Sequence, residues 1–316
     1  MTVAIAILNY NGAKLLEQFL PSVLEHSTNA KVYVIDNGST DNSLEVLATR
    51  FPKVTAIPLH ENTGYAEGYN KGLQEIDAAV VCLLNSDIKV TPHWLLPITT
   101  FLETHPEVSI VQPKIKDLAK PDHFEYAGAA GGYLDIMGLP YCRGRMGRTC
   151  EKDIGQYDNN AQITWASGAC LFVRKSVFNA LEGFDASFFM HFEEIDLCLR
   201  AQAKGYQVWA VGNSEVYHKG AASLAKQHPK KLYYNIRNSL LTYTKTLTIV
   251  PLLWVYVSRL ALDTTLVLYF MVQCKFDHVR AIANAYNAFF ECFQRTFSRR
   301  KDTLNRLRLR SVLIRF

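Results

Sequence analysis

Residues 78–90 read AAVVCLLNSDIKV, and this stretch indicates how the first part of the chain folds. An apolar run from Ala79 to Leu84, typical of a buried strand, stops at the polar residues Asn85-Ser86-Asp87. Strands that alternate with helical patterns predict an α/β fold with a mainly parallel sheet flanked by helices. Three earlier apolar runs followed by helical patterns make up that alternation: TVAIAIL (2–8), KVYVIDNGST (31–40) and VTAIPLH (54–60).

The polar residues at the strand ends are candidate ligand-binding residues. The carboxyl ends of parallel strands share one edge of a sheet, and ligands bind beyond that edge. A carboxylate beside another oxygen ligand, as in Asp87 and Asn85, suits a hard divalent cation such as Mg²⁺ or Mn²⁺. The alternative is an Asx turn or a helix cap before the next helix. The clusters expected at this edge are Asn9-Tyr10-Asn11, Asp36-Asn37-Gly38-Ser39, Asn62-Thr63-Gly64 and Asn85-Ser86-Asp87.

A second candidate site is the acidic stretch HFEEIDLCLR (191–200). On a helix, Glu193, Asp196 and Arg200 share one face because they are three and four residues apart. A carboxyl group beside aromatic surface, such as the preceding SFFMHF, has a raised pKa and can act as a general base. The alternative is that these acids only stabilise the start of a helix. His218, after a strand-like run, is either structural or a further metal or phosphate contact.

Composition and charge exclude several classes of protein. With 49% hydrophobic and 20% charged residues, the chain is typical of folded rather than disordered proteins. The formal net charge of +5 comes from residues 295–316, which carry seven Arg and one Lys against one Asp. We therefore expect no nucleic-acid partner, whereas a basic tail suits an anionic membrane surface. Seven scattered cysteines and an N-terminus without signal-peptide features indicate a cytosolic catalytic part. Dinucleotide, P-loop, GxSxG and HExxH motifs are absent from the sequence.

Taken together, the motifs resemble those of the family 2 glycosyltransferases, and are most similar to the bacterial rhamnosyltransferase-like branch that builds surface polysaccharides. The resemblance implies a GT-A fold with a Rossmann-like sheet. It also implies an inverting enzyme that transfers a sugar from a dTDP- or UDP-sugar to a glycan or lipid-linked acceptor. Rhamnose is the first candidate for this sugar. The matching motifs occur in the family's order: AILNYNG (6–12), VIDNGSTDNS (34–43), ENTGYAEGYN (61–70), LLNSD (83–87), SGACLFVRK (167–175), FFMHFEEIDLCLR (188–200), VYHKGAAS (216–223) and YYNIRNSLL (233–241).

On the donor side, the resemblance implies a metal site and a nucleotide pocket. Asn85 and Asp87 match the DxD-type motif that binds Mg²⁺ or Mn²⁺, and Asp87 is the expected ligand. His218 would complete the metal or diphosphate contacts. Asn85 stands where the motif has its first acid, which leaves one fewer negative charge for the metal. The residues expected around the nucleotide are Asn9, Tyr10, Asp36, Asn62, Gly64, Asn70 and Ser86.

On the acceptor side, Glu193-Glu194 match a Glu-Asp pair whose second member deprotonates the acceptor hydroxyl. Glu194 would then be the base, supported by Asp196. Because Glu194 replaces the usual Asp, either Glu193 or Glu194 can be the base. Two other readings stay open: an inactive sugar-nucleotide-binding or membrane scaffold protein, and a nucleotidyltransferase, for which NYNGAK is a poor loop. The residues expected near the sugar and acceptor are Trp165, Ser167, Gly168 and Arg200.

The C-terminal part has a different character. Long helical patterns without strand signals divide the chain into a catalytic domain, residues 1–225, and a helical appendage, residues 226–316. Residues 247–273 are apolar and long enough to span a bilayer, but Arg259 and Asp263 interrupt them. We expect a helix in the membrane interface, attached peripherally or monotopically to the cytoplasmic face of the bacterial inner membrane. The alternative is a helix packed on the catalytic domain.

Overall fold

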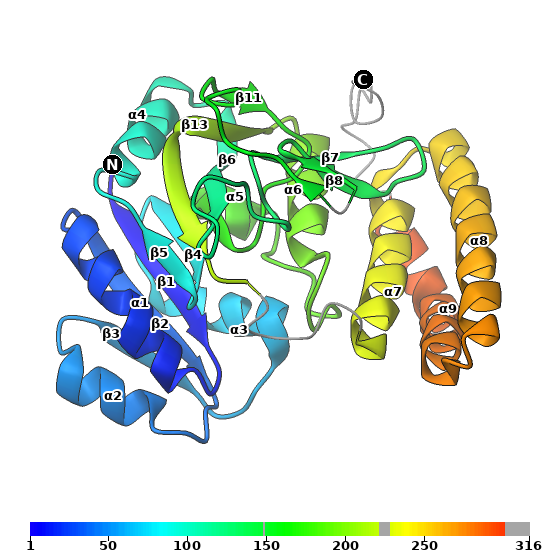
Figure 1. Cartoon of the computed structure of the whole chain (residues 1–316), viewed down its shortest axis with the longest axis horizontal. Coiled ribbons are helices and arrows are strands. Elements are labelled where there is room, and N and C mark those ends of the chain that lie inside the picture. The colour runs from blue at the N-terminus through cyan, green and yellow to red at the C-terminus, as the bar shows by residue number, and fades with distance from the viewer. Residues whose placement is uncertain (148, 221–227, 301–316) are drawn as a thin grey trace.

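The computed structural model describes residues 1–147, 149–220 and 228–300. Figure 1 shows a central sheet flanked by helices, with the C-terminal helices at one end. The main sheet has the strand order β11-β13-β6-β12-β4-β1-β2-β3, and β5 pairs with β13. Its N-terminal half confirms the predicted parallel arrangement, built from β1 (Val3–Asn9), β2 (Ala30–Asn37), β3 (Thr55–Leu59) and β4 (Val80–Asn85).

The register of these strands brings their polar ends together. Asn9 at the end of β1 is opposite Asp36 in β2, and Leu8 is opposite Asn85 in β4. Since the three strands are parallel, the residues that follow them emerge at the same edge of the sheet. The shared edge expected from the sequence is therefore confirmed.

Beyond β4 the sheet is mixed rather than mainly parallel, because β12 runs antiparallel to both of its neighbours. The long strand β6 was not predicted from the sequence. Its buried polar residues Ser109, Gln112 and Lys114 interrupt the apolar pattern and explain why the strand was missed. The strands of this half are β5 (Ile88–Val90), β6 (Val108–Asp117), β11 (Ala161–Gln162), β12 (Cys170–Arg174) and β13 (Gln207–His218).

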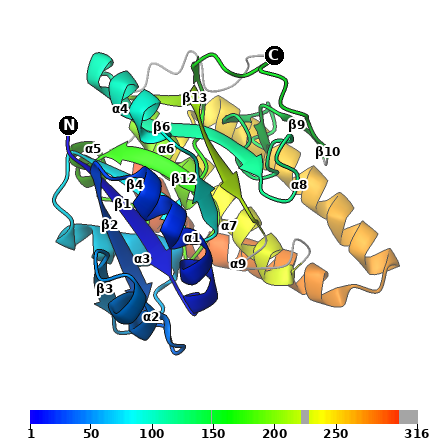
Figure 2. The same cartoon turned by 60° about the vertical axis from the view of Figure 1, so that its left-hand side comes forward.

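Helices cover both faces of the sheet, because the strand side chains alternate between two apolar cores (Figure 2). In β1, Ile5 and Ile7 belong to one core, and Ala4 and Ala6 to the other. The first core is completed by α1 (Ala13–His26), α2 (Ser43–Arg50) and α4 (Leu95–Thr104). The second is completed by α3 (Gly64–Gly72), the short helix η1 (Leu73–Glu75), α5 (Lys175–Ala180) and α6 (Glu193–Ala203).

Small two-stranded sheets occupy the glycine-rich region that follows β6. β7 pairs with β8, and β9 with β10, in both cases antiparallel. Gly132 in β7 lies directly against the ring of Trp165, where a Cβ would be 2.0 Å from a ring atom. The hairpin strands are β7 (Gly132–Leu134), β8 (Pro140–Cys142), β9 (Arg145–Met146) and β10 (Thr149–Cys150).

Three C-terminal helices follow, as the helical patterns predict. α7 contacts both α6 and α9, and buried residues of α7, α8 and α9 belong to the second apolar core. Arg259 and Asp263 form an ion pair at 3.2 Å within α8. The boundary near residue 225 and the basic tail after residue 300 lie outside the described residues, so the two-domain division stays a prediction. The helices are α7 (Pro229–Thr246), α8 (Ile249–Val272) and α9 (Phe276–Ser298).

Candidate active site

The ends of β1 and β2 form a hydrogen-bonded cluster. Asn9 donates from Nδ2 to Oδ1 of Asp36 at 2.9 Å, and Ser39 donates to Asp36 from its backbone N–H at 3.0 Å and from Oγ at 2.6 Å. These contacts leave the Asp36 side chain buried, whereas Tyr10 at the same edge is 50% exposed. The structure therefore brings Asn9 and Asp36 together, and Asp36 stabilises the turn that follows its strand.

A second cluster joins β2 to the turn before α3. Asn37, a member of the polar cluster predicted at the end of β2, donates from Nδ2 to Oδ1 of Asn62 at 3.1 Å and to the carbonyl of Gly64 at 3.0 Å. Gly64 has a φ of +84°, and a Cβ there would lie 2.4 Å from the carbonyl oxygen of Phe189. The neighbouring N–H of Tyr65 donates to that same carbonyl at 2.7 Å. Glycine is required here because the backbone before α6 approaches so closely.

The end of β4 meets the end of β13. The pairing of β5 with β13 places His218 opposite Ile88, so that Nε2 of His218 lies 3.1 Å from Oδ1 of Asp87. Nδ1 of His218 lies 3.6 Å from Oε1 of Glu125, a buried acid that the sequence reading missed. Burial disfavours the charged ring, but the contacts with Asp87 and Glu125 outweigh burial and raise the pKa of His218 to about 10.

The oxygen donors of this cluster fit a divalent cation held together with a diphosphate. Among the described residues there is no group of three His, Cys, Asp or Glu side chains arranged to hold a metal ion. A carboxylate from Asp87 and an amide oxygen from Asn85 are nevertheless sufficient where substrate phosphates supply the other ligands, as is usual for Mg²⁺. A protonated His218 offers no lone pair to a metal and fits a contact with the diphosphate better.

Glu193 and Glu194 begin α6, directly after the positive-φ residues His191 and Phe192. Glu193 is buried and Glu194 half-buried, and Oε2 of each has no hydrogen-bond partner among the described residues. Burial raises the pKa of Glu194 to about 7, although backbone N–H groups at the helix start partly offset it. Burial, followed by repulsion from Glu194, raises the pKa of Glu193 well above its ordinary value. At neutral pH, Glu194 is the carboxyl group better placed to gain and lose a proton.

A two-residue backbone segment links the Asp87 cluster to the Glu194 side. Asn85 donates its N–H to the carbonyl of Ala169 at 3.0 Å. The carbonyl of Gly168 accepts from the hydroxyl of Tyr65 at 2.8 Å. A Cβ on Gly168 would lie 3.8 Å from Cβ of Glu194. The predicted acceptor residue Gly168 thus lies between the predicted metal ligands and the predicted base.

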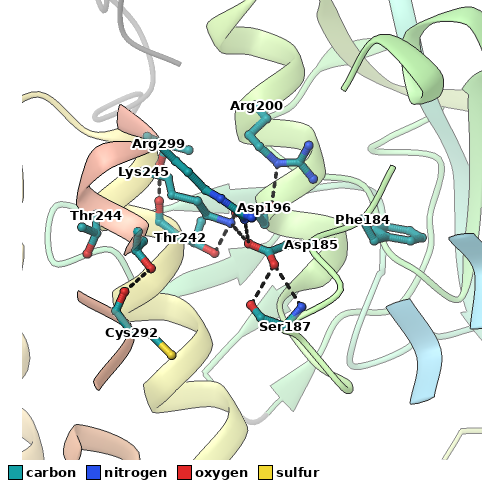
Figure 3. Close-up of polar contacts among 12 residues, drawn as sticks. Phe184, Asp185, Ser187, Asp196, Arg200, Thr242, Thr244, Lys245, Cys292 and Arg299 are labelled. Carbon is teal, nitrogen blue, oxygen red and sulfur yellow. Dashed lines mark hydrogen bonds and ion pairs between the residues drawn. The ribbon is translucent and has the colours of Figure 1, made fainter. Parts of the chain in front are cut away.

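Asp196 and Arg200 lie among charged partners, which Figure 3 shows. Asp196 is fully buried and accepts from Nε of Arg200 at 2.7 Å, while Lys245 of α7 lies 2.6 Å away. The other two nitrogens of Arg200 donate to the carbonyls of Leu181 and Gly183. This arrangement is an internal ion network that supports α6, and all its charged groups have partners within the protein.

Three further predicted residues make contacts inside the protein. Trp165 is buried and donates from Nε1 to the carbonyl of Tyr133 at 2.9 Å. The backbone N–H of Ser167 donates to Oε1 of Gln112 at 2.8 Å. The side chain of Asn70 bonds to Phe184, donating to its carbonyl and accepting from its N–H, both at 2.9 Å. Ser86, by contrast, lies at the strand edge, 4.0 Å from where a Cβ of Gly12 would be. Trp165, Ser167 and Asn70 shape the backbone around the site through these hydrogen bonds.

The comparison with known families identifies the chain's relatives. Residues 4–181 match the sequence profile described as Glycosyl transferase family 2. A curated relative from Mycobacterium tuberculosis, N-acetylglucosaminyl-diphospho-decaprenol L-rhamnosyltransferase, is 27% identical over 241 residues, which cover 70% of this chain and 77% of the relative.

Solved structures of glycosyltransferases share the fold. A mannosyltransferase from Pyrobaculum calidifontis, solved with GDP-Man and Mn²⁺, is similar with a TM-score of 0.56 and 14% identity, over 91% of this chain and 86% of that one. Staphylococcus aureus TarS 1–349, solved with UDP-GlcNAc, is similar with a TM-score of 0.60 and 13% identity, over 96% and 89% of the two chains. At these identities the similarity establishes the fold, which is GT-A, as the sequence resemblance predicted.

Proposed function

The chain belongs to glycosyl transferase family 2, and from this premise we propose that it transfers a sugar with inversion from a nucleoside-diphosphate sugar to a lipid-linked or glycan acceptor. The chain is a rhamnosyltransferase-like glycosyltransferase of glycan synthesis. The first donor we propose is dTDP-rhamnose, and the second a UDP-sugar. The name of the mycobacterial relative, which specifies L-rhamnose and a diphospho-decaprenol acceptor, supports that order.

One observation carries the proposed mechanism: residues 168–169 contact both parts of the site, since Ala169 accepts from the N–H of Asn85 and Gly168 lies beside Glu194. An inverting displacement needs a base on one side of the sugar and charge stabilisation on the other. Glu194, whose pKa is raised to about 7, suits the base. Glu193, the other candidate, is more deeply buried, and burial followed by repulsion from Glu194 raises its pKa well above its ordinary value.

In this mechanism different residues act on the two faces of the sugar. Glu194 accepts the proton from the acceptor hydroxyl, and the acceptor oxygen displaces the nucleoside diphosphate from the opposite face. Asp87 and Asn85 would hold Mg²⁺ or Mn²⁺, which would neutralise the charge that develops on the leaving diphosphate. His218 adds a positive charge beside the diphosphate. Asn9, Tyr10, Asp36, Asn62, Gly64 and Ser86 shape the edge on which the nucleotide binds.

We also propose that the appendage, residues 226–316, attaches the enzyme to the cytoplasmic face of the inner membrane. α8 is long and apolar enough to cross a membrane by length and composition. Leu253, Val257 and Leu260 are exposed and spaced along one side of α8. The ion pair between Arg259 and Asp263 neutralises its charges, which suits a helix lying in the interface. A lipid-linked acceptor would be presented at that surface.

A thermal-shift panel followed by a transfer assay tests the proposal. UDP, dTDP, GDP and CDP are each added with Mn²⁺, Mg²⁺ or EDTA, since binding to the native state raises the melting temperature. We expect a metal-dependent shift with one diphosphate, and transfer from the matching sugar donor. Glu194→Gln should keep the shift and lose the transfer. A folded protein without any shift would contradict the transferase mechanism, and a shift without turnover would favour an inactive binding protein.

A further inference from the structure

Residues 185–192 form the second part of the connection between α5 and α6 and lead directly into Glu193 and Glu194. The last two, His191 and Phe192, have φ values of +66° and +75°. Side-chain-bearing residues rarely adopt this conformation, and it persists only where the surrounding structure holds it. The positions of the two carboxyl groups therefore depend on the contacts that fix this segment.

One side of the segment is held by the catalytic domain, and the other by α7. The carbonyl of Phe189 accepts from the N–H of Tyr65 at 2.7 Å. From α7, the buried Asn238 donates through Nδ2 to two successive carbonyls, those of Met190 at 3.0 Å and His191 at 2.7 Å. One side chain of α7 thus fixes the backbone at the strained turn itself.

Lys245, two turns further along α7, ties both ends of the segment together (Figure 3). Its Nζ lies 2.7 Å from Oδ2 of Asp185, at the start of the segment, and 2.6 Å from Oδ1 of Asp196, in the first turn of α6. The side chain of Lys245 is 3% exposed. A single buried ammonium therefore connects the two carboxylates that flank the turn and the two glutamates.

We infer that α7 is a positioning element of the reaction: Asn238 and Lys245 hold residues 185–192 and the first turn of α6, and so set the position of the Glu194 carboxyl. The inference rests on the proposed role of Glu194 as the base. Neither residue is a catalytic residue, because each acts through the backbone or the ion network. Small displacements of a catalytic group have large effects on rate, so loosening this hold should lower kcat.

A matched pair of lysine variants separates this role from a general loss of stability. Lys114 is also a buried lysine between two carboxylates, with Nζ 3.2 Å from Asp153 and 2.5 Å from Asp158. These contacts lie outside residues 185–196. We expect Lys245→Met to lower kcat at least tenfold while the donor KM changes less than twofold. Lys114→Met should leave both constants within twofold of wild type.

Hydrogen exchange gives a second readout that does not depend on turnover. Peptides covering residues 185–196 should exchange faster in Lys245→Met and in Asn238→Ala than in wild type or Lys114→Met. If Lys245→Met does not fold, kcat and hydrogen exchange are both measured on Asn238→Ala instead. Equal kcat in the two lysine variants, or unchanged exchange in this segment, would overturn the inference. If the wild type transfers no sugar, the proposed function fails, while the exchange data still decide whether α7 holds the segment.

Discussion

Nε2 of His218 lies 3.1 Å from Oδ1 of Asp87, although 131 residues separate them along the chain. The contact arises because β5, which directly follows Asp87, pairs antiparallel with the end of β13. Asp87 therefore has a cationic partner before any ligand binds. A metal ion that binds at this edge has to share the Asp87 carboxylate with His218 or displace His218 from it. A diphosphate has to share His218 with Asp87 or displace Asp87 from it.

Removing the charge of Asp87 should weaken metal-dependent binding. Asp87→Asn keeps an oxygen near His218 but loses the negative charge that attracts a divalent cation. We expect the Mn²⁺ concentration needed for half of the nucleotide-induced thermal shift to rise at least tenfold. Asp122→Asn is the control, because Asp122 is an exposed acid paired with His123 and Lys152. Equal Mn²⁺ dependence in the two variants would show that Asp87 does not hold the metal.

The rate should depend on pH through Glu194. A base with a pKa raised to about 7 is protonated below that pH, so kcat should rise as the pH increases through 7 and then level off. The measurement is the pH profile of kcat at saturating donor and acceptor. A rate that is already constant between pH 5 and 8 would exclude Glu194, in this environment, as the base.

The same raised pKa predicts a pH-dependent effect on stability. Between pH 4.5 and about 7, Glu194 is protonated in the folded chain and ionised in the unfolded one. Its contribution to stability therefore falls as the pH rises through this window. Glu194→Gln removes that penalty, so its stabilisation should be about 1–3 kcal/mol larger at pH 8 than at pH 5. Urea unfolding at the two pH values measures it, and a gain independent of pH would contradict the prediction.

Gly64→Ala should disrupt the contact between the α3 turn and the segment before α6. The added Cβ would meet the carbonyl of Phe189 in addition to straining the positive-φ backbone. Gly205 is a matched control, since its φ of +89° is similar but no atom lies within 4 Å of an added Cβ. We expect a loss of about 2–4 kcal/mol for Gly64→Ala and about 1 kcal/mol for Gly205→Ala, measured by urea unfolding. Equal losses would mean that the turn relaxes freely.

A charge on the exposed side of α8 should weaken membrane attachment. Leu260 is 59% exposed on α8, and Leu96 is 64% exposed on α4. Placing a glutamate in the apolar part of a membrane interface costs on the order of 1–3 kcal/mol. Leu260→Glu should therefore reduce binding to anionic vesicles about tenfold in a flotation assay, while Leu96→Glu should not. If wild type does not float with vesicles, or both variants bind equally, α8 is not the membrane-facing surface.

Several parts of the fold could be predicted from the sequence, because their signals are local. The alternating apolar runs of β1 to β4 predicted parallel strands, and the residues after them predicted one polar edge. The spacing of Glu193, Asp196 and Arg200 predicted a helix, and α6 begins at Glu193 as expected. The apolar pattern also predicted α8, within which Arg259 pairs with Asp263. Each of these features depends on residues within a few turns of one another.

Only the tertiary structure decided which of the predicted residues act together. The sequence predicted Asp196 and Arg200 beside the base, whereas in the structure they form an ion network with Lys245. It did not reveal Glu125 beside His218, because that contact depends on how β6 and β13 bring distant segments together. Hydrophobic patterns report local periodicity, but the partners of a buried charge are set by strand order and helix packing. For that reason the sequence by itself determined the α/β class and the polar edge, and long-range packing determined the neighbours of each site residue.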